Sequence, residues 1–124
     1  MNTDKTTLVI GASEKTERYS NKAIRLLLHY NYKVLALGRR KGNVMGVDIE
    51  NDISQFMGTG IDTVTLYINP SLQVAYYKDI VDLKPKRVIF NPGTENAEFE
   101  NILSNNNIES EEACTLVLLN THQY

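Results

Sequence analysis

Basic residues follow the predicted strand at residues 33–37, where a nucleotide-binding fold would contact a ribose. There Gly38 is followed by Arg39, Arg40 and Lys41. Enzymes that use NAD usually have Asp or Glu at this position, where the carboxylate binds the ribose hydroxyls. Cations favour a phosphate on the ribose instead, because guanidinium groups bind phosphate through charge-assisted, often bidentate, hydrogen bonds. NADP and coenzyme A (CoA) both carry such a phosphate, and a solvated surface loop is the alternative without a ligand.

A second candidate anion site is the loop after the first apolar run. The run at residues 8–10 ends at Gly11, and a polar loop leads from there into an amphipathic segment. Such a turn directs backbone N–H groups and a helix N-terminus beyond the strand end, which favours phosphate. Ser13 and Thr16 stand where the GxGxxG fingerprint needs glycines, so the motif is weak and Gly11 could serve a tight turn only. The loop residues expected to contact the ligand are Gly11, Ala12, Ser13, Arg18 and Ser20.

Apolar runs of strand length alternate along the chain with segments whose apolar residues recur at helical spacing. Ala23, Ile24 and Leu27 share one face of the first such helix, and Ser20 is its expected N-cap. Polar and aliphatic residues alternate over residues 62–68, so one face of that strand is expected to be less buried. We predict strands at residues 6–10, 33–37, 62–68, 86–90 and 107–111, and helices at residues 21–30, 53–57, 71–83 and 95–104. The apolar residues 114–119 fit a helix or a strand, and we favour a final helix.

This alternation predicts a three-layer α/β domain with a parallel sheet. Right-handed crossovers leave few topologies, and we expect a five-stranded parallel sheet in the order 3-2-1-4-5. In that order the first and fourth strands are neighbours, and ligands bind in the crevice at such a switch point. The loops that would meet there are Gly11-Ala12-Ser13 and Asn91-Pro92-Gly93. Asn69-Pro70 ends the third strand, with proline suited to the first turn of a helix.

Composition excludes several classes of protein. A net charge of −2 gives no support for a nucleic-acid binder, and no apolar run has the length of a membrane-spanning helix. The single cysteine excludes an internal disulfide framework and fits a reducing compartment. The polar start at residues 1–5 lacks the apolar core of a signal peptide. We therefore expect one cytoplasmic domain over residues 1–124.

Cys114 and the two histidines are the remaining candidates for chemistry. Cys114 follows the fifth predicted strand, so its thiol could form a mixed disulfide with a thiol ligand if it is exposed as thiolate. The commoner role of a single cysteine in an apolar stretch is that of a small core residue. His29 and His122 have no ligand-like spacing to other residues, so no metal site is expected.

The motifs together resemble those of small stand-alone CoA-binding proteins, which are similar to the CoA-binding domain of the succinyl-CoA synthetase alpha subunit. The resemblance implies a single Rossmann-like domain that binds CoA or an acyl-CoA. The phosphohistidine and ligase parts of the synthetase have no counterpart, so its activity is not implied. The matching residues are Val9 to Ser13 with Arg18 and Ser20, the basic loop, Asn69-Pro70, Asn91 to Asn96, and Ala113 to Thr115.

The resemblance also implies roles for single residues. Gly11, Ala12 and Ser13 would hold the pyrophosphate region of CoA. The residues that would hold the 3′-phosphate or neighbouring phosphates are Arg39, Arg40 or Lys41, and those lining the adenine and pantetheine path are Asn69, Pro70, Asn91, Pro92 and Gly93.

Three functions remain open on the sequence. The first is non-catalytic binding of CoA or an acyl-CoA in a cleft at the carboxyl ends of the strands, as a sensor or carrier. The second is an NADP-binding oxidoreductase or redox sensor, although little chain is left to build a hydride-transfer site. The third is an enzyme acting on acyl-CoA, which would need a base beside Cys114 or a serine. No protein partner is indicated, and the expected partner is the small molecule.

Overall fold

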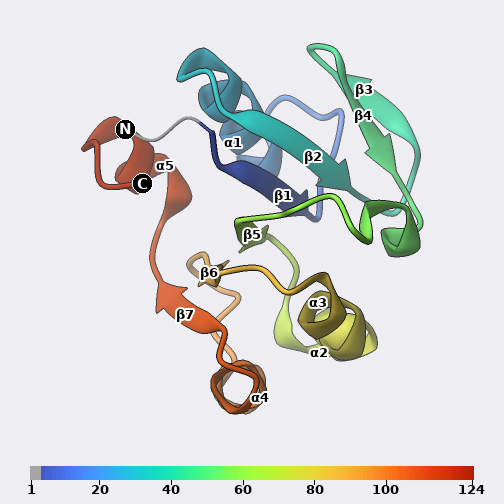
Figure 1. The fold of residues 1–124 in the computed structure, drawn as a ribbon. Helices are drawn as coiled ribbons and strands as arrows, with labels where there is room; N and C mark the ends of the chain where they lie inside the picture. Colours follow the sequence, from blue (N-terminus) through green and yellow to red (C-terminus); the bar gives the residue numbers. More distant parts are fainter. Residues whose placement is uncertain (1–3) are drawn as a thin grey trace.

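Within the described residues 4–124, the centre of the computed structural model is a seven-stranded sheet (Figure 1). Residues 1–3, part of the polar start, lie outside the described residues. The strand order is β3-β4-β2-β1-β5-β6-β7, with β3 antiparallel to β4 and the other neighbours parallel. The strands are β1 (Thr6–Ile10), β2 (Lys33–Leu37), β3 (Gly42–Val44), β4 (Val47–Glu50), β5 (Thr63–Leu66), β6 (Arg87–Phe90) and β7 (Glu109–Glu112).

Helices cover both faces of this sheet. One face carries α1 and α5, and the opposite face carries η1 and α2 to α4 (Figure 1). The sequence expectation of a Rossmann-like α/β architecture is therefore confirmed. The helices are α1 (Tyr19–His29), η1 (Ile53–Phe56), α2 (Pro70–Gln73), η2 (Val74–Tyr76), α3 (Tyr77–Leu83), α4 (Ala97–Asn105) and α5 (Thr115–Asn120).

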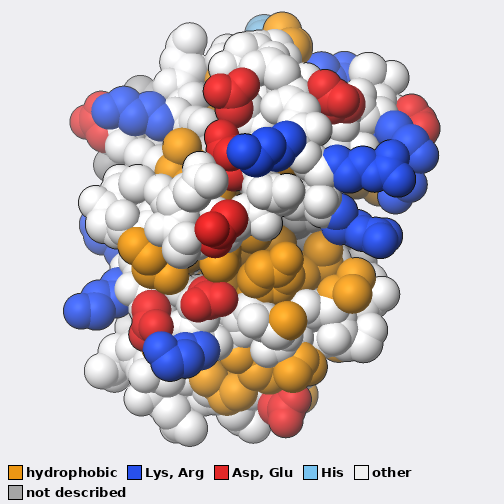
Figure 2. All heavy atoms as spheres, turned by 90° about the vertical axis from the view of Figure 1, so that its right-hand side faces the viewer, with side chains coloured by type: hydrophobic (Ala, Val, Ile, Leu, Met, Phe, Trp, Pro, Cys, Tyr) orange, Lys and Arg blue, Asp and Glu red, His pale blue; other side chains and the backbone are white. Residues whose placement is uncertain are grey.

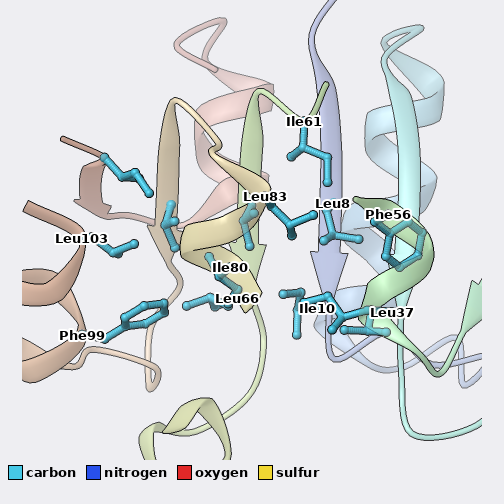
Figure 3. Close-up of a cluster of buried hydrophobic side chains, with 14 of the residues drawn as sticks. Leu8, Ile10, Leu37, Phe56, Ile61, Leu66, Ile80, Leu83, Phe99 and Leu103 are labelled. Carbon is cyan, nitrogen blue, oxygen red and sulfur yellow. The ribbon is translucent and has the colours of Figure 1, made fainter. Parts of the chain in front are cut away.

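Two hydrophobic clusters hold the three layers together. Successive side chains of a strand point to opposite faces, so Leu8 and Ile10 of β1 join one cluster while Val9 joins the other. Figure 3 shows the first cluster, in which Ile80 of α3 and Phe99 of α4 pack beside the strands. All five side chains are fully or almost fully buried, and each such burial stabilises the fold by roughly 2 kcal/mol.

The predicted five-stranded parallel sheet in the order 3-2-1-4-5 is wrong. The strand at Thr63–Leu66 lies beside β1 and not at the far edge beside β2. It separates β1 from β6, which were expected to be neighbours. The order of the strands reverses between β1 and β5, so the switch point lies there.

The added strands come from a hairpin that the sequence did not predict. The side chain of Asn43 closes the turn between β3 and β4, because its Oδ1 accepts a hydrogen bond from Gly46 N and its Nδ2 donates one to Asp48. Met45 and Gly46 both have positive φ (50° and 92°), as the tightest hairpin turns require. Methionine is an unusual residue for that turn, and each strand is short, so the segment lacks an ordinary hairpin pattern.

The polar face of β5 is buried, contrary to expectation. Thr63 and Thr65 have no exposed surface. Their hydroxyls find partners inside the protein: Thr63 Oγ1 accepts a hydrogen bond from Arg87 Nε, and Thr65 Oγ1 bonds to the hydroxyl of Thr115. Because each hydroxyl is satisfied, threonine can occupy a central strand without the cost of an unpaired polar group.

Two helices differ in detail from their predicted form. The first begins two residues earlier than expected, with Arg18 as its N-cap residue, so Ser20 lies buried in the first turn and is not the N-cap. The helix predicted at residues 71–83 is divided into α2, η2 and α3. Pro70 lies in the first turn of α2, as expected, and Asn69 is the capping residue, which was not predicted from the sequence.

Arg87 organises the edge of the sheet where the strands begin. Its guanidinium donates hydrogen bonds to Thr63 Oγ1, Glu111 Oε2 and the main-chain oxygen of Tyr124. It also lies 4.5 Å from the centre of the Tyr124 ring. Its side chain is only 13% exposed, so these contacts join β5, β6, β7 and the segment after α5.

We expect Arg87→Ala to lower the free energy of unfolding by about 2–3 kcal/mol, because a mostly buried cation loses several hydrogen bonds and its packing against Tyr124. Urea denaturation measures the change. Lys86→Ala is the matched control. Lys86 Nζ lies 3.8 Å from Asp62 Oδ2, and the lysine side chain is 84% exposed. We therefore expect its loss to change the free energy of unfolding by no more than about 0.5 kcal/mol. Equal effects of the two substitutions would contradict the central role of Arg87.

Candidate functional site

The expected site residues lie on the loops at the carboxyl ends of β1, β2, β5 and β6, except Ser20 and Pro70, which lie in the first turns of α1 and α2. Figure 2 shows the side of the molecule toward which the arrows of β1 and β2 point in Figure 1. Lys and Arg side chains gather at the upper right of this face, and hydrophobic side chains spread over its lower half. The face therefore offers cations beside apolar surface.

The loop after β1 is fixed by its own backbone. The N–H groups of Gly11 and Ala12 both donate to the carbonyl oxygen of Leu37, at 2.9 Å each. Gly11 has a φ of +95°, and a Cβ at this position would lie 2.9 Å from the carbonyl oxygen of Tyr67. Only glycine fits there. The hydrogen bonds of these two N–H groups attach the loop to the end of β2. On its other side, Gly11 packs against the segment after β5.

The start of α1 is the part of this loop that can receive an anion. Arg18 stands at the N-cap position with extended backbone, no side chain caps the helix, and its first turn has no acidic residue. The first-turn N–H groups of a helix lack partners within the helix, and the positive end of the helix dipole favours negative charge there. Asn21 fixes this turn, because its Nδ2 donates to Ser13 O at 2.8 Å.

The basic loop, residues 38–41, packs against the loop after β1. A Cβ on Gly38 would lie 2.4 Å from Ala12 O, so the two loops touch through their backbones. Lys41 Nζ lies 3.9 Å from Glu50 Oε1. Arg39 and Arg40 are exposed, and within residues 4–124 no ion pair or hydrogen bond of either guanidinium is found. Two unpaired guanidinium groups therefore stand on a loop that contacts the loop after β1.

Gln73 joins the loop after β5 to the loop after β6. It is fully buried, and its Nε2 donates to Ile68 O and Thr94 O. Its Oε1 accepts a hydrogen bond from Asn96 Nδ2, which also donates to the Tyr77 hydroxyl. Gln73 was not among the expected residues, since a glutamine within a helical stretch gives no sign of such contacts.

Asn91 has a structural role at this edge. Its Nδ2 donates to Thr65 Oγ1 and Leu66 O, and its Oδ1 accepts the Thr115 N–H at 2.9 Å. The residue is 2% exposed. Its side chain thus connects β5, β6 and the start of α5, and all of its hydrogen-bonding atoms are engaged. Asn69 is similarly occupied, because its Oδ1 caps α2.

Cys114 lies at the same edge, directly before α5, and is partly buried. The Tyr67 hydroxyl is buried nearby. Burial raises the pKa of Tyr67 well above its ordinary value, the Thr115 hydroxyl opposes the shift, and the Cys114 thiol adds to it. The tyrosine is therefore held neutral, and within residues 4–124 no histidine or carboxylate forms a hydrogen bond to the thiol.

Other surface features lie away from this face. Two hollows of about 400 Å³ lie at the opposite edge of the sheet, lined by residues that precede β1, β5, β6 and β7. They contain none of the expected site residues. In the described part of the chain, no group of His, Cys, Asp and Glu could hold a metal ion. No helix of residues 4–124 is long and apolar enough to cross a membrane.

The structure brings the expected loops together in a different arrangement from the predicted one. Gly11 contacts the segment after β5 and Gly38 contacts Ala12. The segment 67–70, and not the Asn91-Pro92-Gly93 loop, lies next to the loop after β1. The latter loop lies one strand further along the sheet.

Comparison with known proteins identifies a family and a fold. The profile of the CoA-binding domain family matches residues 5–120. No protein with a curated description matches significantly. The crystal structure of an uncharacterised protein is 48% identical, with a TM-score of 0.93, and covers 99% of this chain and 100% of its own.

More distant structures share the fold. A hypothetical protein from Pyrococcus horikoshii OT3 is 25% identical, with a TM-score of 0.82 over 94% of this chain and 81% of its own. An acetyl-coenzyme A synthetase from Ca. Korarchaeum cryptofilum is 17% identical, with a TM-score of 0.72 over 88% of this chain. This chain corresponds to 25% of the synthetase, so that likeness concerns one part of a larger protein.

We expect Asn91→Ala to lower the free energy of unfolding by about 3 kcal/mol, because the buried Thr115 N–H and Thr65 hydroxyl lose partners. Thermal or urea unfolding without ligand measures the loss. Asn101→Ala is the matched control, since Asn101 is exposed on α4, and a change within about 0.5 kcal/mol is expected. A stable Asn91→Ala protein would show that Asn91 is free for another role.

Proposed function

Because the chain belongs to the CoA-binding domain family, we propose that it binds CoA or an acyl-CoA at the carboxyl ends of β1, β2, β5 and β6. The protein acts in this proposal without catalysis, as a sensor or carrier. The family match supports the ligand, and the loops described above support the place. The switch point between β1 and β5 is where open α/β sheets bind ligands.

The unpaired pair Arg39 and Arg40 is the observation that carries this proposal. Both guanidinium groups are exposed on a loop whose backbone packs on the loop after β1. They bind the 3′-phosphate of CoA through charge-assisted hydrogen bonds. Lys41 contributes less, because Glu50 lies close to its ammonium group.

The pyrophosphate belongs at the start of α1. Gly11 and Ala12 shape the loop there, but their N–H groups already bond to Leu37 O. The remaining donors are the loop from Ser13 and the first turn of α1 around Ser20. Arg18 adds a positive charge at the N-cap position.

The pantetheine arm follows the loops after β5 and β6. The side chains of Asn69 and Asn91 are engaged in internal hydrogen bonds, so Pro70, Pro92 and Gly93 would line the path mainly through their backbone and ring atoms. Leu72 in α2 is 51% exposed, and hydrophobic side chains are spread over the lower half of this face (Figure 2). Apolar surface suits the uncharged arm of the ligand.

We infer a binding role because, within residues 4–124, the Cys114 thiol has no base paired with it. A nucleophilic thiol needs a base within hydrogen-bond reach, and Cys114 has no such histidine or carboxylate within residues 4–124. Hydrolysis of acetyl-CoA that is lost in Cys114→Ala would overturn the non-catalytic role.

The direct test is thermal unfolding with CoA, dephospho-CoA, NADP and NAD in parallel. A ligand at 100 times its Kd stabilises the fold by about 2.7 kcal/mol, which raises the Tm by several degrees for a domain of this size. We expect CoA to raise the Tm most, and dephospho-CoA less. A larger shift with NADP would show that the phosphate site serves a dinucleotide, and no shift with any compound would contradict the proposal.

Variants of the basic loop locate the phosphate. We expect Arg39→Ala with Arg40→Ala to weaken CoA binding by at least about tenfold, since hydrogen bonds to charged groups are lost, and to leave dephospho-CoA binding almost unchanged. Lys33→Ala is the matched control, because Lys33 is exposed at the other end of β2. Titration calorimetry measures both ligands, and equal losses for CoA and dephospho-CoA would place the 3′-phosphate elsewhere.

A further inference from the structure

Glu14 places a carboxylate between the two loops assigned to phosphate binding. Its Oε2 accepts a hydrogen bond from the backbone N–H of Asn43, with 3.0 Å between N and Oε2. Asn43 stands two residues after Lys41. A negative charge beside an expected phosphate site is unfavourable for the ligand, so its position needs a reason. We call this contact the Glu14 bridge.

Gly42 provides the space for the Glu14 bridge. A Cβ at residue 42 would lie 2.6 Å from Glu14 Cδ and 2.9 Å from Oε2. The φ of Gly42 is not positive, so its backbone does not need glycine. The absence of a side chain at residue 42 therefore matters chiefly for the carboxylate that lies over it.

The other contacts of this part of the loop lead to α1. Asn21 Nδ2 donates to Ser13 O, and Arg25 Nη2 donates to Thr16 O. Residues 13–16 are thereby fixed to the helix whose N-terminus faces the site. Within the described residues, the Glu14 bridge is the hydrogen bond that connects residues 13–16 and α1 to the segment after the basic loop.

We propose that Glu14 is a positioning residue that sets the distance between the basic loop and the start of α1, and so determines the preference for a ligand with a 3′-phosphate. This inference rests on the proposed function, because it assigns CoA to the same site. A pyrophosphate and a 3′-phosphate are at a fixed separation in the ligand, so both are bound well only when the two loops keep their spacing.

The charge of Glu14 is compatible with this role. The side chain is exposed, so water and salt screen its repulsion of phosphate. A glutamine at residue 14 keeps an oxygen acceptor for the Asn43 N–H and removes the charge. An alanine removes both, and a side chain at residue 42 displaces the carboxylate without removing it.

The test compares Glu14→Ala, Glu14→Gln and Gly42→Ala by titration calorimetry with CoA and dephospho-CoA. We expect Glu14→Ala and Gly42→Ala to reduce the preference for CoA roughly fivefold, the value of one lost hydrogen bond. Glu14→Gln should keep the preference of the natural protein. Glu17→Ala is the matched control, since it removes the same charge from an exposed position on the same loop, and it should also keep the preference.

Amide hydrogen exchange of Asn43 provides a readout that needs no ligand. Glu14→Ala and Gly42→Ala should speed exchange at this amide, and Glu17→Ala should not. An unchanged exchange rate of the Asn43 amide in Glu14→Ala would show that the Glu14 bridge is not formed. Unchanged preference in Glu14→Ala would overturn its effect on the ligand, and tighter CoA binding would show that the carboxylate competes with phosphate.

Failure of the proposed function would look different. If the natural protein does not bind CoA, the ligand assignment is wrong and the inference falls with it, whatever exchange at Asn43 shows. If the natural protein prefers CoA and Glu14→Ala shares that preference, only the inference is overturned. A parallel loss of preference in Glu17→Ala would show a general charge effect and would also overturn it.

Discussion

Backbone contact without side chains is the constraint on which the candidate site depends. Gly11 lies against the carbonyl of Tyr67, and Gly38 lies against the carbonyl of Ala12. Any Cβ at either position would push apart segments that follow three adjacent strands, β2, β1 and β5. The parallel register of these strands brings their carboxyl ends to one edge, and the two glycines let the loops close over it. The groups proposed to bind phosphate lie on these loops, so their arrangement depends on the two glycines.

The candidate site combines two ways of attracting an anion. The uncapped start of α1 offers backbone N–H groups and a helix dipole, while Arg39 and Arg40 offer mobile charges on long side chains. Backbone donors suit a group whose position is fixed by the fold. Guanidinium groups suit the outer phosphate, where the ligand meets solvent. Under the proposed function, these two features would hold phosphate groups at two separate points of CoA, the ligand that the family match supports.

Local patterns predicted the elements better than their order. The strands at Thr6–Ile10 and Lys33–Leu37 have the predicted bounds, and the segment after Cys114 is helical as expected. The predicted sheet order was wrong because right-handed crossovers leave more than one topology open. The contacts of the strand at Thr63–Leu66, such as those of its threonines with Arg87 and Thr115, join residues that are distant in the sequence. The hairpin of β3 and β4 was missed because its strands are short. Likewise, the type and spacing of Gly11, Gly38 and Arg39 indicated the site loops, but the contacts of Gln73 and Glu14 depend on tertiary structure.

The side chain of Asn91 has a consequence for how the protein would meet a ligand. With its donors and acceptor satisfied by Thr65, Leu66 and Thr115, the turn after β6 is held in one conformation before any ligand arrives. Together with the amide of Gln73, it fixes the loops after β5 and β6 relative to each other. Binding at the proposed site would therefore involve little loss of backbone entropy, which is the usual cost of ordering a loop on binding. Under the proposed function, the exposed side chains of Arg39 and Arg40 are then the part of the site that adjusts to the ligand, and they would select among phosphorylated ligands.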